Sequence, residues 1–153
     1  MNRRVLVVGL GNLIMKDEGI GPRIIEEFKH RQEDFCGVDF VDAGTGGMSL
    51  LHIIENREEV IFIDCAEMGM KPGEIKKFEP AEVQSLNNQP STSLHQADLL
   101  KIIGISKQLD QYPGKITIFG IQPEIIAPGR ELSETLSSKL PDYIREISAE
   151  IKN

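Results

Sequence analysis

Short, almost continuously apolar runs alternate along the chain with longer segments of mixed polarity. Three such runs span 4–10, 60–65 and 115–121, and a fourth, shorter run spans 38–42. Continuous hydrophobicity over so few residues is typical of strands that are covered on both faces, as in a parallel sheet. The more polar segment 74–79 lies between a Pro-Gly turn and a proline, and it predicts an edge strand that can run antiparallel to its neighbour.

The segments between these runs carry apolar residues at the spacing of amphipathic helices, so we expect each helix to pack one face on the sheet. The predicted helices cover 19–33, the region 48–54, a segment that opens near His95, and a last segment from an N-cap at Ser133 to the C-terminus. Pro141 is expected to kink or split the last helix. The apolar positions of the four helices are Ile20, Ile24, Ile25 and Phe28; Met48, Leu51 and Ile54; Leu99, Ile102 and Ile103; and Leu132, Leu136, Leu140, Ile144, Ile147 and Ile151.

The alternation of strand and helix from end to end predicts an α/β fold. We expect a single three-layer α/β/α domain with a mostly parallel, right-handed sheet of about five strands. The 153 residues leave room for one domain, which we expect to cover 1–153, and a hydrophobic fraction of 40% is enough for a proper core.

Charge and cysteine usage narrow the range of partners. The net charge is −7 and no basic run is long enough to follow a phosphate backbone, so we expect no nucleic-acid binding. No apolar stretch has the length of a membrane span or the form of a signal core, which predicts a cytoplasmic protein without membrane attachment. Cys36 and Cys65 lack CxxC spacing, and we expect both to be reduced thiols in the core.

Candidate chemistry is expected at one edge of the sheet, because ligands of open α/β sheets bind beyond the carboxyl ends of the parallel strands. This rule selects the loops 11–21, 42–47, 64–69 and 122–124. Each of them brings carboxylates or amides to that edge. The sequence therefore predicts an acidic cleft there.

A dinucleotide site is one alternative, because Gly9 and Gly11 follow a strand in the manner of a GxGxxG motif. The third glycine position is occupied by Ile14, and Asp17 and Glu18 would place negative charge where a pyrophosphate needs backbone donors. The chain also has no GxxxxGK[ST] loop. A Rossmann-like, nucleotide-binding enzyme is therefore disfavoured, although it stays open.

Several acidic residues at this edge also have structural interpretations. Asp17 and Glu18 would stabilise the positive end of a helix dipole. Asp42 would accept hydrogen bonds from the amides of 44–47 and cap the second helix, which is as well founded as a catalytic role. Asp64 is harder to explain by packing, because a carboxylate at the end of an apolar run needs a partner, a cation or a solvent-facing cleft.

One histidine stands apart from the other two. His30 and His52 lie within predicted helices without carboxylate-rich surroundings, whereas His95 follows a polar stretch, as a loop-borne ligand would. Glu18, Asp64 and His95 together offer two carboxylates and one imidazole. Three such ligands suit nickel, zinc or a related ion and leave coordination positions open for a substrate atom or water.

Five short motifs occur in order along nearly the whole chain. They are VVGLGNLIMKDEGIG (7–21), VDAGTGG (41–47), IDCAEMGMKPGE (63–74), SLHQ (93–96) and GIQPE (120–124). Each is weak alone, but their joint pattern is specific, and the chain resembles the hydrogenase maturation endopeptidases. The third and fifth motifs are most similar to the enzymes that serve group 4, formate-hydrogenlyase-type and related [NiFe] hydrogenases.

The resemblance implies a cytoplasmic peptidase that removes a C-terminal extension from the nickel-loaded precursor of a [NiFe] hydrogenase large subunit. By this resemblance Glu18, Asp64 and His95 match the metal ligands, and Asp42 matches an aspartate implicated in activity. The expected catalytic residues are thus Asp42, Glu18 and Asp64. Nickel is expected to arrive with the substrate, zinc or cadmium being able to replace it in vitro, and the protein is expected to be a monomer that pairs transiently with the precursor.

Two mechanisms stay open under this resemblance. In the first, the three ligands grip the nickel of the substrate as a recognition handle, and Asp42 or a nearby carboxylate activates water, as in an aspartic-type peptidase. In the second, the bound metal polarises the scissile carbonyl or lowers the pKa of water. We favour the first, because the family is understood to sense nickel already inserted in its substrate. A non-catalytic nickel or hydrogenase assembly factor, which would use the same cleft only to hold its partner, is the other function that stays open.

Overall fold

One sheet of five strands runs through the protein in a computed structural model that describes 4–45, 47–82 and 94–152, with the side chains of 94–98 left out. The order across the sheet is β2-β1-β3-β5-β4. The strands are β1 (Val5–Gly9), β2 (Val38–Asp42), β3 (Glu59–Cys65), β4 (Ile75–Phe78) and β5 (Lys115–Ile121). All pairs are parallel except β4 with β5, so the predicted antiparallel edge strand is confirmed.

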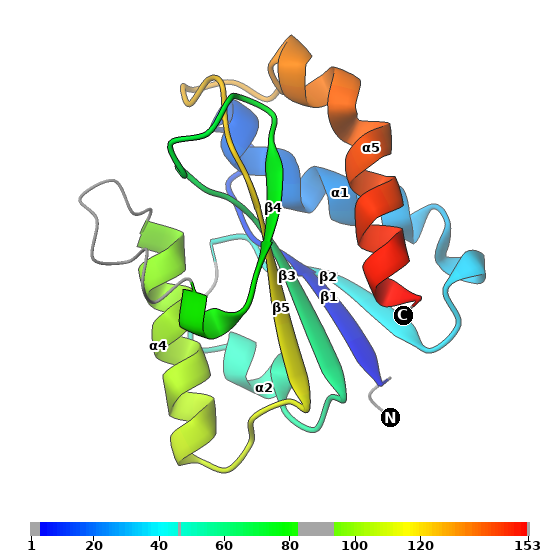
Figure 1. Cartoon of the computed structure of the whole chain (residues 1–153), viewed down its shortest axis with the longest axis vertical. Helices are drawn as coiled ribbons and strands as arrows, with labels where there is room; N and C mark the ends of the chain where they lie inside the picture. Colours follow the sequence, from blue (N-terminus) through cyan, green and yellow to red (C-terminus); the bar gives the residue numbers. More distant parts are fainter. Residues whose placement is uncertain (1–3, 46, 83–93, 153) are drawn as a thin grey trace.

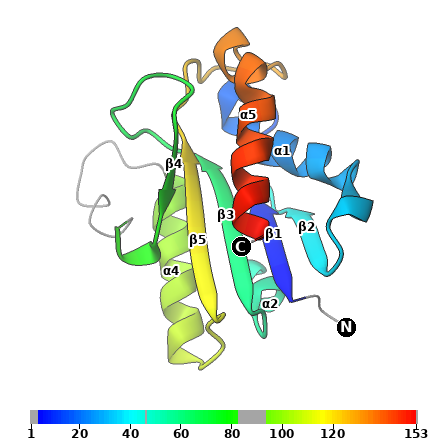
Figure 2. The ribbon, with the colours of Figure 1, turned by 45° about the vertical axis from the view of Figure 1, so that its right-hand side comes forward.

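Helices cover both faces of this sheet. Figure 1 shows α1 (Ile20–Lys29) and α5 (Glu134–Ile151) on one face, and α2 (Leu50–Ile54) and α4 (Leu94–Gln108) on the other. Figure 2 shows the same three layers after a turn about the vertical axis. Short 3-10 helices precede and follow α1, namely η1 (Lys16–Gly19) and η2 (Gln32–Asp34). The predicted three-layer α/β/α fold is confirmed.

The pleat of the strands divides the core into two clusters. Along β1, Leu6 and Val8 belong to the cluster under α2 and α4, whereas Val7 belongs to the cluster under α1 and α5. The same alternation along β3 puts Cys65 under α1 and α5 and gives Asp64 a position on the opposite face. Each fully buried aliphatic or aromatic side chain contributes roughly 1.5–3 kcal/mol, so both layers are firmly held on the sheet.

Two helix boundaries differ from the prediction. The first helix ends at Lys29 rather than at 33, and the chain continues into η2. Met48 lies exposed ahead of α2, so its assignment to a buried helix face is wrong. Gly47 has a φ of +117°, which does not fit a right-handed helix. The short helix α2 begins only after it, at Leu50.

The prediction that Cys36 lies in the core is wrong, and so is the part of the Pro141 prediction that expects a split helix. Pro141 does not split the last helix, because α5 runs through it as one element. A proline inside a helix costs about 3 kcal/mol, and the buried face that includes Tyr143 offsets this cost. Cys36 is exposed, because its neighbour Phe35 occupies the core position and packs edge-on against Phe28.

The predicted N-cap of α5 is confirmed, since the backbone N–H of Leu136 donates to Ser133 Oγ at 3.3 Å. None of the helices within the described ranges is both long enough and apolar enough to cross a membrane.

A buried carboxylate joins the loop after β1 to the loop after β5. The side chain of Asp17 is fully buried, and its Oδ2 accepts hydrogen bonds from the backbone N–H groups of Glu124 and Ile125, both at 2.9 Å. Its Oδ1 accepts from the N–H of Ser133 at 2.7 Å. Hydrogen bonds to a carboxylate contribute roughly 1.5–3 kcal/mol each. Asp17 is therefore a structural clamp between segments far apart in the sequence, and not merely a charge at a helix end.

A second buried carboxylate connects α5 to β4 and β5, the last two strands on one side of the sheet. Glu150 accepts hydrogen bonds from Nζ of Lys77 in β4 and Nζ of Lys115 in β5, both at 3.2 Å. Burial by itself raises the pKa of Glu150, but the hydrogen bonds from the two lysines outweigh it and hold that pKa below its ordinary value. The charged form of Glu150 is thus stabilised in the folded state.

We expect Asp17→Asn to lower the free energy of unfolding by about 2 kcal/mol or more, because the new NH2 group would face backbone N–H donors in a buried site. Urea denaturation measures the difference. Asp34→Asn, an exposed position in η2, serves as the control and should change little. Equal stability of the two variants would contradict the clamp.

The contribution of Glu150 to stability should depend on pH. Its folded-state pKa lies below the unfolded value, so the contribution is complete above the unfolded pKa and disappears as the pH falls through the folded pKa. We expect Glu150→Gln to cost about 1–2 kcal/mol at neutral pH and much less in acid, measured by urea denaturation at both pH values. Glu146→Gln, exposed on the same helix, is the matched control. A loss for Glu150→Gln that does not vary with pH would refute this account.

Candidate functional site

The loops that follow β1, β2, β3 and β5 meet at one edge of the sheet, because these four strands run parallel (Figure 1). The loop after β1 is bound to its neighbours on both sides. Leu10 N donates to Ile63 O in β3 at 2.8 Å, and Gly11 N donates to Gly44 O after β2 at 2.6 Å. The predicted convergence of the loops is confirmed.

Three glycines allow this loop and the start of α1 to lie directly on the strands. A Cβ at Gly21 would come within 2.4 Å of Leu10 O and 2.7 Å of Ile63 O, and a Cβ at Gly9 within 2.6 Å of Gly21 O. Gly11 has a φ of +146°, and a Cβ there would meet Glu18 O at 1.9 Å. Close backbone packing therefore accounts for these glycines without a nucleotide.

Glu18 occupies a rigid position in η1. Its carbonyl accepts from Asn12 N at 3.2 Å and its N–H donates to Met15 O at 3.1 Å. The preceding residue is the clamp Asp17, and η1 contacts β3. The side chain itself is half-buried, so the fold fixes its backbone while leaving the carboxylate within reach of a ligand.

Asp64 lies at the end of β3, where its side chain is 1% exposed. The pKa of the neighbouring Cys65 thiol is affected by the charges in this region. Burial is the largest cause that raises the pKa of Cys65, and the carboxylates of Asp64, Glu18, Asp17 and Glu67 raise it further. The loops after β1 and β3 thus bring several carboxylates to one place. The Cys65 thiol stays protonated there, which makes a thiolate ligand unfavourable.

Gln122 fixes the loop after β3, a role that the sequence analysis did not assign. Its buried side chain accepts at Oε1 from Met68 N at 2.7 Å and from Met70 N at 3.3 Å. Its Nε2 donates to Glu67 Oε1 at 2.8 Å. The only feature of the sequence that could have indicated this role is the position of Gln122, a polar residue directly after an apolar strand. The end of β5 therefore holds the loop that follows Asp64.

Asp42 ends β2 and is exposed. Its Oδ1 accepts from Gly44 N at 2.9 Å, which is part of the predicted structural interpretation. It does not cap the second helix, because α2 begins at Leu50 and its N-cap makes no side-chain hydrogen bond. Asp42 also borders a small pocket of about 190 Å³, together with Leu13 and Pro22 of the first loop and α1. It is thus an oriented, solvent-accessible carboxylate beside that loop.

The structure places the backbone of His95 in the first turn of α4, and its side chain lies outside the described residues. α4 covers the face of the sheet to which the register position of Asp64 belongs. The predicted ligand role of His95 stays a prediction. His30 follows α1 and His52 lies within α2, both exposed, in agreement with the sequence analysis.

Among the side chains that the structure describes, no three from His, Cys, Asp and Glu are grouped closely enough to hold a metal ion. The predicted set needs the imidazole of His95 as its third member. Glu18 and Asp64 are hard oxygen donors, which bind a divalent transition metal well when an imidazole completes the set. Their chemistry fits the prediction.

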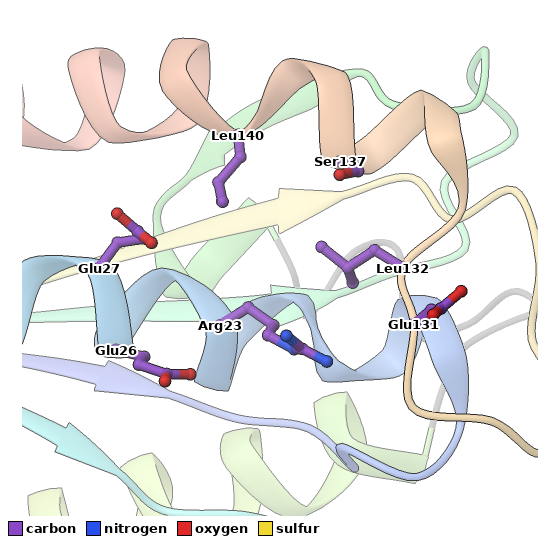
Figure 3. A pocket seen from close by; sticks show the side chains of 7 residues that line it. All are labelled: Arg23, Glu26, Glu27, Glu131, Leu132, Ser137 and Leu140. Carbon is purple, nitrogen blue, oxygen red and sulfur yellow. The ribbon is translucent and has the colours of Figure 1, made fainter.

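Another hollow, of about 370 Å³, lies between α1 and α5 (Figure 3). Arg23 lies at its wall and donates a hydrogen bond to Arg130 O. This hollow contains none of the predicted site residues. It is lined by Arg23, Glu26, Glu27, Glu131, Leu132, Ser137 and Leu140.

Relatives with similar sequences are proteins of hydrogenase maturation. The chain is 30% identical over 150 residues to the hydrogenase 2 maturation protease of Escherichia coli K12, which covers 97% of this chain and 91% of the relative. It is 32% identical over 120 residues to the hydrogenase expression/formation protein HupD of Rhizobium leguminosarum. That alignment covers 78% of this chain and 59% of HupD, so the chain spans less than two thirds of this relative.

Solved structures with the same fold carry related names. The hydrogenase maturating endopeptidase HybD from E. coli superposes with a TM-score of 0.87 at 28% identity, over 97% of this chain and 92% of HybD. A solution structure of an endopeptidase from Escherichia coli gives a TM-score of 0.83 at 30% identity, over 95% and 90%. Residues 22–150 match the sequence profile of the family described as hydrogenase maturation protease. Since this profile covers most of the chain and the fold agrees over nearly all of it, the chain belongs to the hydrogenase maturation protease family.

Proposed function

We propose that this protein is an endopeptidase that removes the C-terminal extension from the nickel-loaded precursor of a [NiFe] hydrogenase large subunit. The observation that supports the proposal most is that η1, which carries Glu18, contacts β3, which carries Asp64, in a chain of this family. His95 opens α4 on the corresponding face. Action in the cytoplasm as a monomer belongs to the same proposal.

The nickel is part of the substrate, and Glu18, Asp64 and His95 are its proposed ligands. The carboxylates around the end of β3 create a negative potential that favours a cationic centre. Two carboxylates and one imidazole leave further coordination positions to the substrate's own groups. Zinc or cadmium would fit the same donors in vitro. Binding of the nickel would bring the adjacent peptide segment to the edge of the sheet.

Asp42 is the proposed general base. The hydrogen bond from Gly44 N orients its carboxylate, and its exposure gives it access to water. A water molecule would transfer a proton to Asp42 as its oxygen attacks the scissile carbonyl carbon, and the proton would then pass to the departing amine. This division makes Glu18 and Asp64 binding groups and Asp42 the reacting one. It corresponds to an aspartic-type peptidase, with the metal as the recognition handle.

Two substitutions separate binding from chemistry. We expect Glu18→Gln to weaken the complex with the nickel-loaded precursor, because a neutral amide replaces a charged ligand, and to lower cleavage at least about 100-fold. Asp42→Asn should leave binding intact and lower kcat by about 10²–10⁴. Intact-mass analysis of the precursor measures cleavage, and interferometry on the immobilised precursor measures binding.

Glu33→Gln, an exposed position in η2, is the control for both variants. Precursor without nickel is the second control and should bind poorly to the wild-type protein. Cleavage of the loaded precursor by Glu18→Gln at the wild-type rate would refute the assignment of Glu18. A stable complex of the wild-type protein with the loaded precursor, without any shortened product, would instead support the assembly factor.

A further inference from the structure

Four large apolar side chains lie exposed on the two loops that Asp17 joins. Leu13 and Ile14, in the loop after β1, are 42% and 57% exposed. Ile125 and Ile126, in the loop after β5, are 39% and 46% exposed. We call these four side chains the apolar rim. In the described part of the chain the other large hydrophobic side chains with comparable exposure are Met48, Leu109 and Tyr112.

The apolar rim is built on a rigid frame. Lys16 N donates to Gly129 O and Gly129 N donates to Ile14 O, both at 2.9 Å, which forms a parallel bridge between the two loops. Asp17 N donates to Ile125 O at 3.2 Å, and the buried carboxylate of Asp17 accepts a hydrogen bond from Ile125 N in the same loop. The backbones that carry the four side chains are thus ordered before any partner arrives. Binding on such a frame costs little conformational entropy.

Exposure of single apolar residues is common, but a cluster on a rigid frame needs a reason. Met48 is one exposed residue ahead of α2, and Leu109 and Tyr112 lie between α4 and β5, at the opposite end of the sheet. The apolar rim lies instead at the carboxyl ends of the strands, beside the candidate site. Its exposed apolar surface is therefore best explained by an interaction at that site.

We propose that the apolar rim binds an apolar segment of the substrate polypeptide next to the scissile bond, an inference that rests on the proposed function. The apolar rim is continuous with the site on two sides. Glu18 directly follows the clamp Asp17, and Leu13 lines the small pocket that Asp42 borders. A peptide side chain seated on Leu13 would thus bring its backbone close to the proposed base. The substrate is held by its cationic nickel at the carboxylates and by this apolar contact beside them.

A second copy of this chain is a poorer occupant. The chain carries a net charge of −7, Asp42 borders the pocket that Leu13 lines, and Glu124 directly precedes Ile125. Two copies that met at this surface would bring like charges together, which disfavours association. A substrate segment that carries a metal cation complements the same charges.

The experiment compares the double variant Ile14→Ser/Ile126→Ser with the wild-type protein in cleavage of the nickel-loaded precursor. We expect KM, and the Kd measured on the immobilised precursor, to rise about tenfold or more while kcat stays unchanged. Leu109→Ser, with 55% exposure at the far end of the sheet, is the matched control and should change KM by less than about twofold. Unchanged unfolding midpoints confirm that all variants are folded.

The possible outcomes separate this proposal from the proposed function. Normal cleavage by the wild-type protein with an unchanged KM in the double variant would overturn the apolar rim and leave the peptidase intact. Tight binding without cleavage by the wild-type protein, weakened in the double variant, would support the apolar rim and overturn the peptidase. Neither binding nor cleavage by the wild-type protein would overturn both. Self-association that the double variant abolishes in sedimentation would assign the surface to a second copy and overturn the substrate assignment.

Discussion

The site depends on one buried carboxylate that does no chemistry itself. Asp17 accepts backbone hydrogen bonds from Glu124, Ile125 and Ser133, so one side chain organises the loop after β5 and the start of α5. The same residue belongs to η1, the turn that presents Glu18. Because a buried carboxylate needs several donors to offset its lost hydration, the three N–H groups and the clamp stabilise each other. The fold therefore fixes the backbone position of the neighbouring Glu18.

Close backbone contact is the second constraint on the site. Gly9 and Gly21 let α1 begin directly on the ends of β1 and β3, since a Cβ at either glycine would collide with backbone atoms there. Burial, and after it the charges of Asp64, Glu18 and Asp17, raise the pKa of the adjacent Cys65 thiol, so several carboxylates lie near the end of β3.

The sequence predicts the strands well, because buried parallel strands leave continuous apolar runs that few other structures produce. It also predicts the N-cap Ser133 and the convergence of the loops after β1 and β3, since both follow from local pattern and strand direction. It does not predict the roles of Asp17 and Gln122. Their partners are backbone groups of distant segments, and backbone donors leave no trace in a sequence.

The errors have the same origin in tertiary packing. Pro141 lies inside a helix, where a proline is unfavourable, and the burial of one face of α5 offsets this cost. Cys36 is apolar enough for a core, but the cluster of Phe28, Phe35 and Phe40 leaves no place for it. Local propensities compete at each position with packing energies of several kcal/mol, so they decide only where packing is neutral.

The separation of charge from apolar surface at this edge suggests how the protein would select its substrate under the proposed function. In that proposal the carboxylates near Asp64 would bind a cation, whereas Leu13, Ile14 and Ile126, which are exposed, would bind an apolar chain. The apolar contact alone is weak, because an exposed apolar patch of this size contributes little. Both together, on one rigid frame, add their free energies with only one loss of translational freedom. A precursor without its metal would make the apolar contact but would leave the carboxylates without a cation. It would therefore bind more weakly than the loaded precursor, and this difference in affinity would be the basis of the selection.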